Sequence, residues 1–239
     1  NLSTEEILVR SSNVGSVILA QKIGEDVFKK FIKNTNLTKV PEIELEEVGA
    51  PHEIKWNKCK IETVSFGHGI TTTPLQATTL YASLTNGGNL VTPSLIKERK
   101  KIETKKIISN ETSKEISSIL RQVVSSENGT ASLADIDGYY VGGKTGTAES
   151  YGNNKQRINS FISVFPTKKP NYSLFVMLEN PKLNKDLVYN YRGIKTKAPY
   201  NTSGWNSVYA AGKIIEKIGP ILAINNKDFL NQYVVEKFN

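Results

Sequence analysis

The sequence predicts an α+β protein in which helices pack against an antiparallel sheet. Helical patterns fill the first half of the chain and one more closes it, while three strand-like runs follow one another between Tyr139 and Leu178. Alternating strand and helix units, which produce parallel sheets, do not occur in this pattern. We therefore expect a three-strand meander between helical segments, within a single domain that spans residues 1–239.

Three short helices are expected at the start of the chain. Ser3 is followed three residues later by Glu6, which is a capping box in front of an apolar pair. Residues 10–13 interrupt this helix, and helical patterns resume over 14–23 and 25–32. The segment 34–56 is irregular and reads as loops.

Two longer helices have clear start signals. Thr73 is a good N-cap and Pro74 suits the first helical position, while Asn86-Gly87-Gly88 ends that helix. Ser109 caps the next helix. Its apolar stripe consists of Ile116, Ile119, Leu120, Val123 and Val124.

The strand runs follow, and a long loop and a final helix come after them. The first strand is expected at Gly142–Ala148, after an apolar and aromatic lead-in at 139–141, and two further strand-like runs span 160–165 and 172–178. The segment 179–204 reads as a long basic and aromatic loop. Thr202 or Ser203 should cap the last helix, and Gly219-Pro220 should stop it. Its expected buried face is Trp205, Val208, Ala211, Gly212, Ile215 and Ile218.

Composition excludes several kinds of site. The chain has 239 residues, a formal net charge of +8, a single cysteine and only two histidines. A histidine-based metal site and a Ser-His-Asp triad are therefore not expected, and no cofactor is predicted. The net positive charge is the one feature that suggests nucleic-acid binding. The basic residues are scattered and match no nucleic-acid-binding motif. No apolar run is long enough to span a bilayer.

The first strand carries the most distinctive stretch, Gly142-Gly143-Lys144-Thr145-Gly146-Thr147-Ala148. Lysine supplies a positive charge and the threonines supply hydroxyl donors at the edge of a strand. Such an edge can pair with an extended peptide and hold its carboxylate. The alternative is a glycine-containing strand with a solvated lysine.

A Ser-x-Asn triplet, Ser11-Ser12-Asn13, lies between two helical segments. The Ser11 hydroxyl could relay a proton, and the Asn13 amide could bind a substrate carbonyl. A second match at 126–128 is rejected because it ends a helix that reads as structural and leaves too little spacing before Lys144.

Together with Lys144-Thr145-Gly146, these features occur in a specific order. Ser11-Ser12-Asn13 comes first, and Ser65-Phe66-Gly67-His68-Gly69 and Thr73-Pro74-Leu75 follow. After the lysine motif come Asn159-Ser160-Phe161 and Gly204-Trp205-Asn206. Over nearly the whole chain, this order resembles the C-terminal part of the transpeptidase domain of class B penicillin-binding proteins. The likeness is closer to the cell-division transpeptidase than to the elongation paralogue.

The resemblance implies a peptidoglycan D,D-transpeptidase of septal wall synthesis, which acylates a serine with the D-Ala-D-Ala end of a stem peptide and is trapped by β-lactams. It implies that Ser11 relays a proton, with Asn13 as its companion, and that Lys144 supports the electrostatics. It further implies that the Thr145 and Thr147 hydroxyls hold the carboxylate, that Gly146 leaves room for the acyl chain, and that the Thr147 backbone N–H completes an oxyanion hole.

One feature departs from the family pattern. The family nucleophile lies in Ser-x-x-Lys upstream of Ser-x-Asn, whereas the only such motif here is Ser94-Leu95-Ile96-Lys97. We interpret Ser94 as a chance match, so the chain reads as a partial transpeptidase domain that lacks the nucleophile and is inactive alone. The resemblance also implies a septal glycosyltransferase and other division proteins as partners. It implies a location on the periplasmic face of the bacterial inner membrane, through an upstream anchor that this chain lacks.

Two further interpretations stay open within the same fold. One is a non-catalytic β-lactam sensor or scaffold. The other is a serine β-lactamase, which the resemblance along 65–77 and at Trp205 disfavours.

Overall fold

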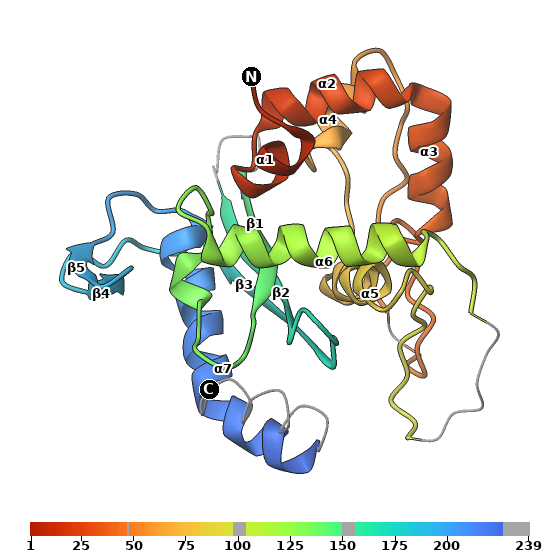
Figure 1. The fold of residues 1–239 in the computed structure, drawn as a ribbon. Helices are drawn as coiled ribbons and strands as arrows, with labels where there is room; N and C mark the ends of the chain where they lie inside the picture. The colour runs from red at the N-terminus through yellow and green to blue at the C-terminus, as the bar shows by residue number, and fades with distance from the viewer. Residues whose placement is uncertain (47, 98–103, 150–155, 227–239) are drawn as a thin grey trace. The chain divides into compact units, whose positions relative to one another are not determined.

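A computed structural model describes residues 1–46, 48–97, 104–149 and 156–226 (Figure 1). The described residues form two compact units, Asn1–Ile116 and Ser117–Asn239. The boundary between them falls within one helix, α6 (Asn110–Ser125).

The first unit is helical. Its described helices before α6 are α1 (Thr4–Val9), α2 (Asn13–Ile23), α3 (Glu25–Asn34), α4 (Lys60–Ser65) and α5 (Pro74–Thr85).

Local capping signals fix several of these helices, as the sequence predicts. The Ser3 hydroxyl accepts from the Glu6 N–H at 3.1 Å and the Glu6 carboxylate accepts from the Ser3 N–H at 2.8 Å. Thr73 caps α5 by accepting from the Gln76 N–H at 3.1 Å. Ser109 accepts from the backbone of the first turn of α6 in the same way. The sequence analysis missed the short helix α4.

The second unit contains the predicted meander. Strands β1 (Gly142–Glu149), β2 (Arg157–Phe165) and β3 (Tyr172–Glu179) are antiparallel in the order β1-β2-β3. The α+β prediction is confirmed. The first strand begins at Gly142, because Tyr140 has a φ of +46° and breaks the extended backbone before it.

The core of this unit lies between the sheet, the last turns of α6 and α7 (Ser207–Asn225), which packs on β2 and β3 (Figure 1). Its fully buried side chains include Val123, Val141, Phe161, Phe165, Val208 and Ile215. A short 3₁₀ helix, η1 (Ser132–Ala134), also packs against α7.

The predicted limits of α7 are wrong at both ends. Asn206 caps the helix, not Thr202 or Ser203, because residues 203–205 form a separate 3₁₀ turn, η2. The helix also continues through Pro220, although proline removes one helical hydrogen bond. Burial holds the turn beyond it: Ala223 is 2% exposed, and the Tyr172 hydroxyl donates to the Leu222 carbonyl at 3.3 Å.

The predicted loop 179–204 contains a small hairpin. Strands β4 (Val188–Tyr191) and β5 (Ile194–Lys197) pair antiparallel. Trp205 of η2 stacks on Tyr191 and makes an edge contact with Tyr189, with ring centroids 5.0 and 5.3 Å apart. Aromatic packing therefore attaches this segment to the start of α7.

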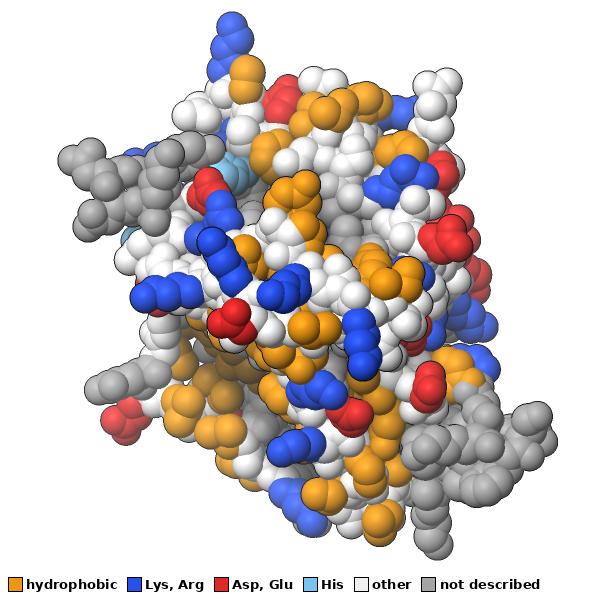
Figure 2. All heavy atoms as spheres, turned by 90° about the vertical axis from the view of Figure 1, so that its left-hand side faces the viewer, with side chains coloured by type: hydrophobic (Ala, Val, Ile, Leu, Met, Phe, Trp, Pro, Cys, Tyr) orange, Lys and Arg blue, Asp and Glu red, His pale blue; other side chains and the backbone are white. Residues whose placement is uncertain are grey.

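Exposed apolar side chains line one side of α7. Ile218, expected to be buried, is exposed because the buried stripe passes instead through Ile215, Gly219 and Ala223. Figure 2 views the molecule from the left-hand side of Figure 1. It shows hydrophobic side chains in the lower part of the view, where the C-terminal half of α7 lies. The exposed isoleucines of the helix are Ile214, Ile218, Ile221 and Ile224.

Gly219 allows α7 to lie against the Tyr139 ring, since a Cβ atom there would overlap ring carbons. We expect Gly219→Ala to destabilise the protein, because overpacking costs about 1–3 kcal/mol and the helix propensity of alanine offsets only about 1 kcal/mol. Urea unfolding measures the difference. Lys217→Ala, on the exposed side of α7, is the control and should change stability by less than about 0.5 kcal/mol. An unchanged midpoint for Gly219→Ala would contradict the packing.

Candidate active site

Strand β1 carries the lysine motif directly above the core. Gly142 and Gly143 are buried, and their missing Cβ positions are filled by Thr167 and by the backbone and ring of residues on β2. These two glycines therefore serve close packing of the protein on itself. At Gly146 an added Cβ would lie 2.7 Å from the Ser160 hydroxyl of the opposite strand. The strand becomes progressively more exposed from Lys144 to Glu149.

Lys144 is half-buried at the point where β1 leaves the core. Its ammonium donates to the Thr145 carbonyl at 3.3 Å. Burial lowers the pKa of Lys144 to about 8, because removing the ammonium from water disfavours its charged form. At neutral pH the side chain is mostly charged, but its proton is far easier to remove than that of an exposed lysine. Such a group can both attract an anion and exchange a proton.

The two threonines of the motif are held by hydroxyl groups from other segments. Thr145 Oγ1 lies 2.9 Å from Thr130 Oγ1, in the turn after α6. Thr147 Oγ1 lies 2.9 Å from Ser203 Oγ, in η2. Because residues on alternate positions of a strand face the same side, both threonine hydroxyls lie on the opposite face from the Lys144 side chain.

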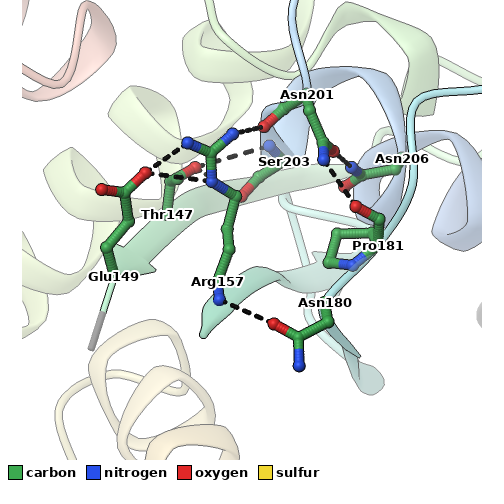
Figure 3. Close-up of polar contacts among 8 residues, drawn as sticks. All are labelled: Thr147, Glu149, Arg157, Asn180, Pro181, Asn201, Ser203 and Asn206. Atoms are coloured by element: carbon green, nitrogen blue, oxygen red, sulfur yellow. Dashed lines mark hydrogen bonds and ion pairs between the residues drawn. The ribbon is translucent and has the colours of Figure 1, made fainter. Parts of the chain in front are cut away.

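An arginine ties the end of β1 to the loop before α7 (Figure 3). The Arg157 guanidinium pairs with the Glu149 carboxylate and donates to the Asn201 carbonyl at 2.8 Å. The Asn201 amide donates to the Pro181 carbonyl at 2.5 Å and accepts from the Asn206 amide at 3.0 Å. The network therefore fixes the loop that carries Ser203.

Ser11 and Asn13 lie together in the first unit, at the junction of α1 and α2. Ser12 caps α2 by accepting from the Gly15 N–H at 3.1 Å, and its own N–H donates to the Ile7 carbonyl at 2.9 Å. Ser11 has a φ of +57°, and it and Asn13 are exposed. The middle residue of the triplet is thus structural, and its neighbours on both sides reach solvent.

The predicted site residues are therefore distributed over two units. Lys144, Thr145, Gly146 and Thr147 are adjacent on β1 in the second unit. Ser11 and Asn13 belong to the first unit. The structure brings each group together internally, and the roles assigned to them stay predictions.

Ser94 lies in an irregular segment of the first unit, next to a bend at residues 95–96, rather than on a helix. Its hydroxyl donates to the Glu44 carboxylate at 2.7 Å and accepts from the Ile96 N–H at 3.1 Å. Lys97 is exposed. These contacts are those of a structural serine, in line with its interpretation as a chance match.

The sequence analysis missed three residues that shape the β1 site: Thr130, Arg157 and Ser203. Thr130 follows the Asn128-Gly129 turn and Arg157 opens a strand, but neither position has a pattern that points to β1. Ser203 was considered only as a helix cap. Their partners lie 15, 44 and 56 residues away in the chain, beyond the range of local sequence signals.

The described part of the chain contains neither a metal-binding cluster nor a membrane-spanning helix. No group of three or more His, Cys, Asp or Glu side chains within it could hold a metal ion. None of its helices is long and apolar enough to cross a membrane.

The fold and the lysine strand define a class of protein. The chain belongs to the penicillin-binding protein transpeptidase domain family, because the family described as "Penicillin binding protein transpeptidase domain" matches residues 1–201. The resemblance inferred from the motifs is thereby confirmed.

Two curated relatives illustrate the similarity. The chain is 32% identical over 240 residues to the "Probable peptidoglycan D,D-transpeptidase FtsI" of Caulobacter vibrioides, covering 95% of this chain and 39% of that protein. It is 34% identical over 197 residues to "Stage V sporulation protein D" of Bacillus subtilis, covering 74% of this chain and 30% of that protein. The chain thus spans between 30% and 39% of the length of these relatives.

Solved structures show the same fold. Penicillin binding protein 3 from Mycobacterium tuberculosis, complexed with ampicillin, aligns with a TM-score of 0.76 at 23% identity, covering 91% of this chain and 51% of that one. The TP domain of penicillin-binding protein 3 from Burkholderia pseudomallei aligns with a TM-score of 0.76 at 21% identity, covering 92% and 65%.

The lowered pKa of Lys144 can be measured directly. We expect the ¹³Cε resonance of Lys144 to titrate with a midpoint near pH 8, with the ammonium below and the amine above, because burial disfavours the charge. Lys213 is the internal control: its hydrogen bond to Glu216 raises its pKa above the ordinary value. If Lys144 titrated at the same pH as Lys213, burial would not lower the pKa of Lys144 as proposed.

Proposed function

We propose that this chain is part of a peptidoglycan D,D-transpeptidase that cross-links stem peptides through an acyl-serine intermediate and is acylated by β-lactams. In this proposal the two compact units belong to one transpeptidase domain. The observation that carries it is a half-buried lysine of lowered pKa, followed by two buttressed threonines, at the emerging end of a strand in a fold of this family. The name of the Caulobacter relative supports the same reaction.

The reaction assigns a task to each part of the β1 motif. A serine oxygen attacks the carbonyl carbon between the last two D-alanines, the C–N bond breaks, and D-alanine leaves after its nitrogen gains a proton. An amine on a neighbouring strand then attacks the acyl-serine, and the serine hydroxyl is regenerated. Lys144 supports the electrostatics and the proton movement, and the Thr145 and Thr147 hydroxyls hold the terminal carboxylate. The Thr147 backbone N–H stabilises the oxyanion. Gly146 leaves space for the acyl chain.

Ser11 and Asn13 supply the remaining groups of this mechanism. The Ser11 hydroxyl relays a proton to or from the leaving nitrogen, and the Asn13 amide binds a substrate carbonyl. Ser11 and Asn13 are exposed at the end of a turn whose backbone is fixed by Ser12, so their side chains are presented at a defined place. The acylated serine is proposed to lie in a Ser-x-x-Lys motif outside this chain, since Ser94 is held by Glu44.

The cellular setting is proposed from the relatives. Septal wall synthesis is proposed from the resemblance to the cell-division transpeptidase, and the D,D-transpeptidase named FtsI supports it. A second relative is named for sporulation. A septal glycosyltransferase and other division proteins are the proposed partners. The periplasmic face of the inner membrane is the proposed location.

Fluorescent penicillin tests the proposed function. We expect no label on this chain alone, and a label on an upstream serine when the chain is extended to include Ser-x-x-Lys. Peptide mapping identifies the labelled residue. In the extended form Lys144→Ala should slow labelling by about 10²-fold or more, since positioned proton transfer contributes that much. The control is Lys213→Ala, an exposed lysine of the same unit whose loss should leave the rate unchanged.

Other outcomes would identify other functions. Label at Ser94 would mean that the nucleophile lies in this chain and that the mapping of the motifs is wrong. Many turnovers of a chromogenic cephalosporin would indicate a serine β-lactamase. Non-covalent penicillin binding without any acylated serine, in the short and extended forms alike, would indicate a sensor or scaffold.

A further inference from the structure

A small cavity lies where the loop 181–187, the β4–β5 hairpin and the start of α7 meet. The hairpin lies beside the first turns of α7 (Figure 1). The cavity has a volume of about 190 Å³, which equals about six water molecules at about 30 Å³ each. This space suits one small ring with its substituents. The described residues that line it belong to the second unit, and none of them lies on β1. The side chains that determine its chemistry are Lys182, Asn184, Tyr189, Trp205, Asn206 and Tyr209.

Three aromatic rings form a fixed wall of the cavity. Tyr189 is 5% exposed, and its ring makes edge contacts with Trp205 and Tyr209 at centroid distances of 5.3 and 5.0 Å. Tyr191 of the same strand stacks on Trp205 at 5.0 Å. Trp205 and Tyr209 are partly exposed, so they offer apolar ring surface that a ligand can reach. Rings held in this way lose little freedom when a ligand binds.

Hydrogen bonds hold the two loops that enclose the cavity. Arg192, at the turn of the hairpin, donates to the Ser125 and Ser126 carbonyls at the end of α6. The Asn201 amide donates to the Pro181 carbonyl at 2.5 Å, which ties the start of the loop 181–187 to the segment before α7 (Figure 3). The shape of the cavity therefore does not depend on ring contacts alone.

The polar side chains of the cavity offer mainly hydrogen-bond donors. The Asn184 carbonyl accepts from two backbone N–H groups of its own loop at 2.9 and 3.2 Å, so its NH₂ group is what it can offer a ligand. The Asn206 carbonyl accepts from the next backbone N–H at 2.7 Å, and its NH₂ group uses one of two protons on Asn201. The exposed Lys182 adds an ammonium group, and none of the described lining residues is acidic. The cavity therefore suits a ligand that carries oxygen acceptors.

A sugar ring with an acetamido substituent matches this combination. One face of a pyranose carries C–H groups that pack on aromatic rings, and its edge carries oxygens that accept from amide N–H groups. The acetamido group adds a carbonyl oxygen and a methyl group, and Leu183 and Leu187 also line the cavity. An aromatic peptide side chain would use the rings but would leave the donors of Asn184 and Asn206 without partners, which is unfavourable.

We propose that this cavity binds one N-acetylated amino-sugar ring of the glycan strand that carries the stem peptide. This assignment rests on the proposed function, because the stem peptides of peptidoglycan are attached to such sugars. Trp205 and Tyr209 contact the C–H face of the ring, and Asn184 donates to the acetamido carbonyl. The methyl group lies against Leu183 and Leu187. A glycan strand held here keeps its stem peptide near the protein, which raises the effective concentration of that peptide.

Titration of this chain with chitotetraose, a tetramer of N-acetylglucosamine, tests the site by NMR. The indole N–H resonance of Trp205 should shift saturably, whereas that of Trp56 in the first unit should not move. Cellotetraose has the same linkage but carries hydroxyl groups in place of the acetamido groups. We expect it to bind about tenfold more weakly, because a hydrogen bond and a buried methyl group are lost together.

Two variants locate the binding site. Tyr209→Leu removes a ring but keeps apolar volume, and it should weaken chitotetraose binding about tenfold. Asn184→Asp keeps the oxygen that accepts from the loop backbone and removes both amide protons, so the chain should stay folded and bind several-fold more weakly. The matched control is Tyr200→Leu, which removes an exposed ring that is not among the lining residues and should leave the affinity unchanged.

Failure of the sugar site is distinguishable from failure of the proposed function, because sugar binding is measured on this chain and penicillin labelling on the extended form. Chitotetraose binding without any penicillin label would support the sugar site and contradict the proposed reaction. The sugar site is overturned if the Trp205 resonance does not respond to chitotetraose, or if Tyr209→Leu and Asn184→Asp both bind it as tightly as the unmodified chain. Equal binding of cellotetraose would overturn the acetamido assignment. A response to p-cresol and not to chitotetraose would overturn the sugar site and indicate an aromatic side chain as the ligand.

Discussion

The close approach of β1 to the core is the constraint on which the site depends. Gly142 and Gly143 have no side chains, and atoms of Thr167, Phe161 and Ile162 occupy the space where Cβ atoms would stand. Phe161 is itself fully buried, so the strand packs against closely packed core atoms that have little room to move. The next residues of the strand emerge from this contact in a fixed direction. A side chain at either glycine would displace the whole lysine motif.

Three segments that are distant in sequence meet at that emerging strand. The turn after α6 supplies Thr130, the loop before α7 supplies Ser203, and Arg157 of the neighbouring strand holds the loop in place. The hydroxyl groups of Thr130 and Ser203 contact the threonines of β1 directly. Arg157 does not contact these threonines but holds the loop that carries Ser203. These contacts hold the two threonine side chains in place before any ligand arrives, which reduces the cost of binding.

Lys144 has a lowered pKa and still carries a positive charge at neutral pH. Its partial burial lowers its pKa to about 8, yet it stays mostly charged at neutral pH. In the proposed reaction, deeper burial would remove the positive charge of Lys144, whereas full exposure would keep its proton too firmly bound for transfer. The strand that leaves the core at this residue therefore sets its chemistry as well as its place.

The sequence by itself determined the helix starts at Ser3, Thr73 and Ser109, the three-strand meander, and the family, because caps, alternation and ordered motifs are properties of neighbouring residues. Only the tertiary structure decided that α7 continues through Pro220, that 179–204 contains a hairpin, and that Ser203 binds Thr147. It also decided the pKa of Lys144. These features depend on burial and on contacts between segments far apart in the chain, which no local pattern encodes.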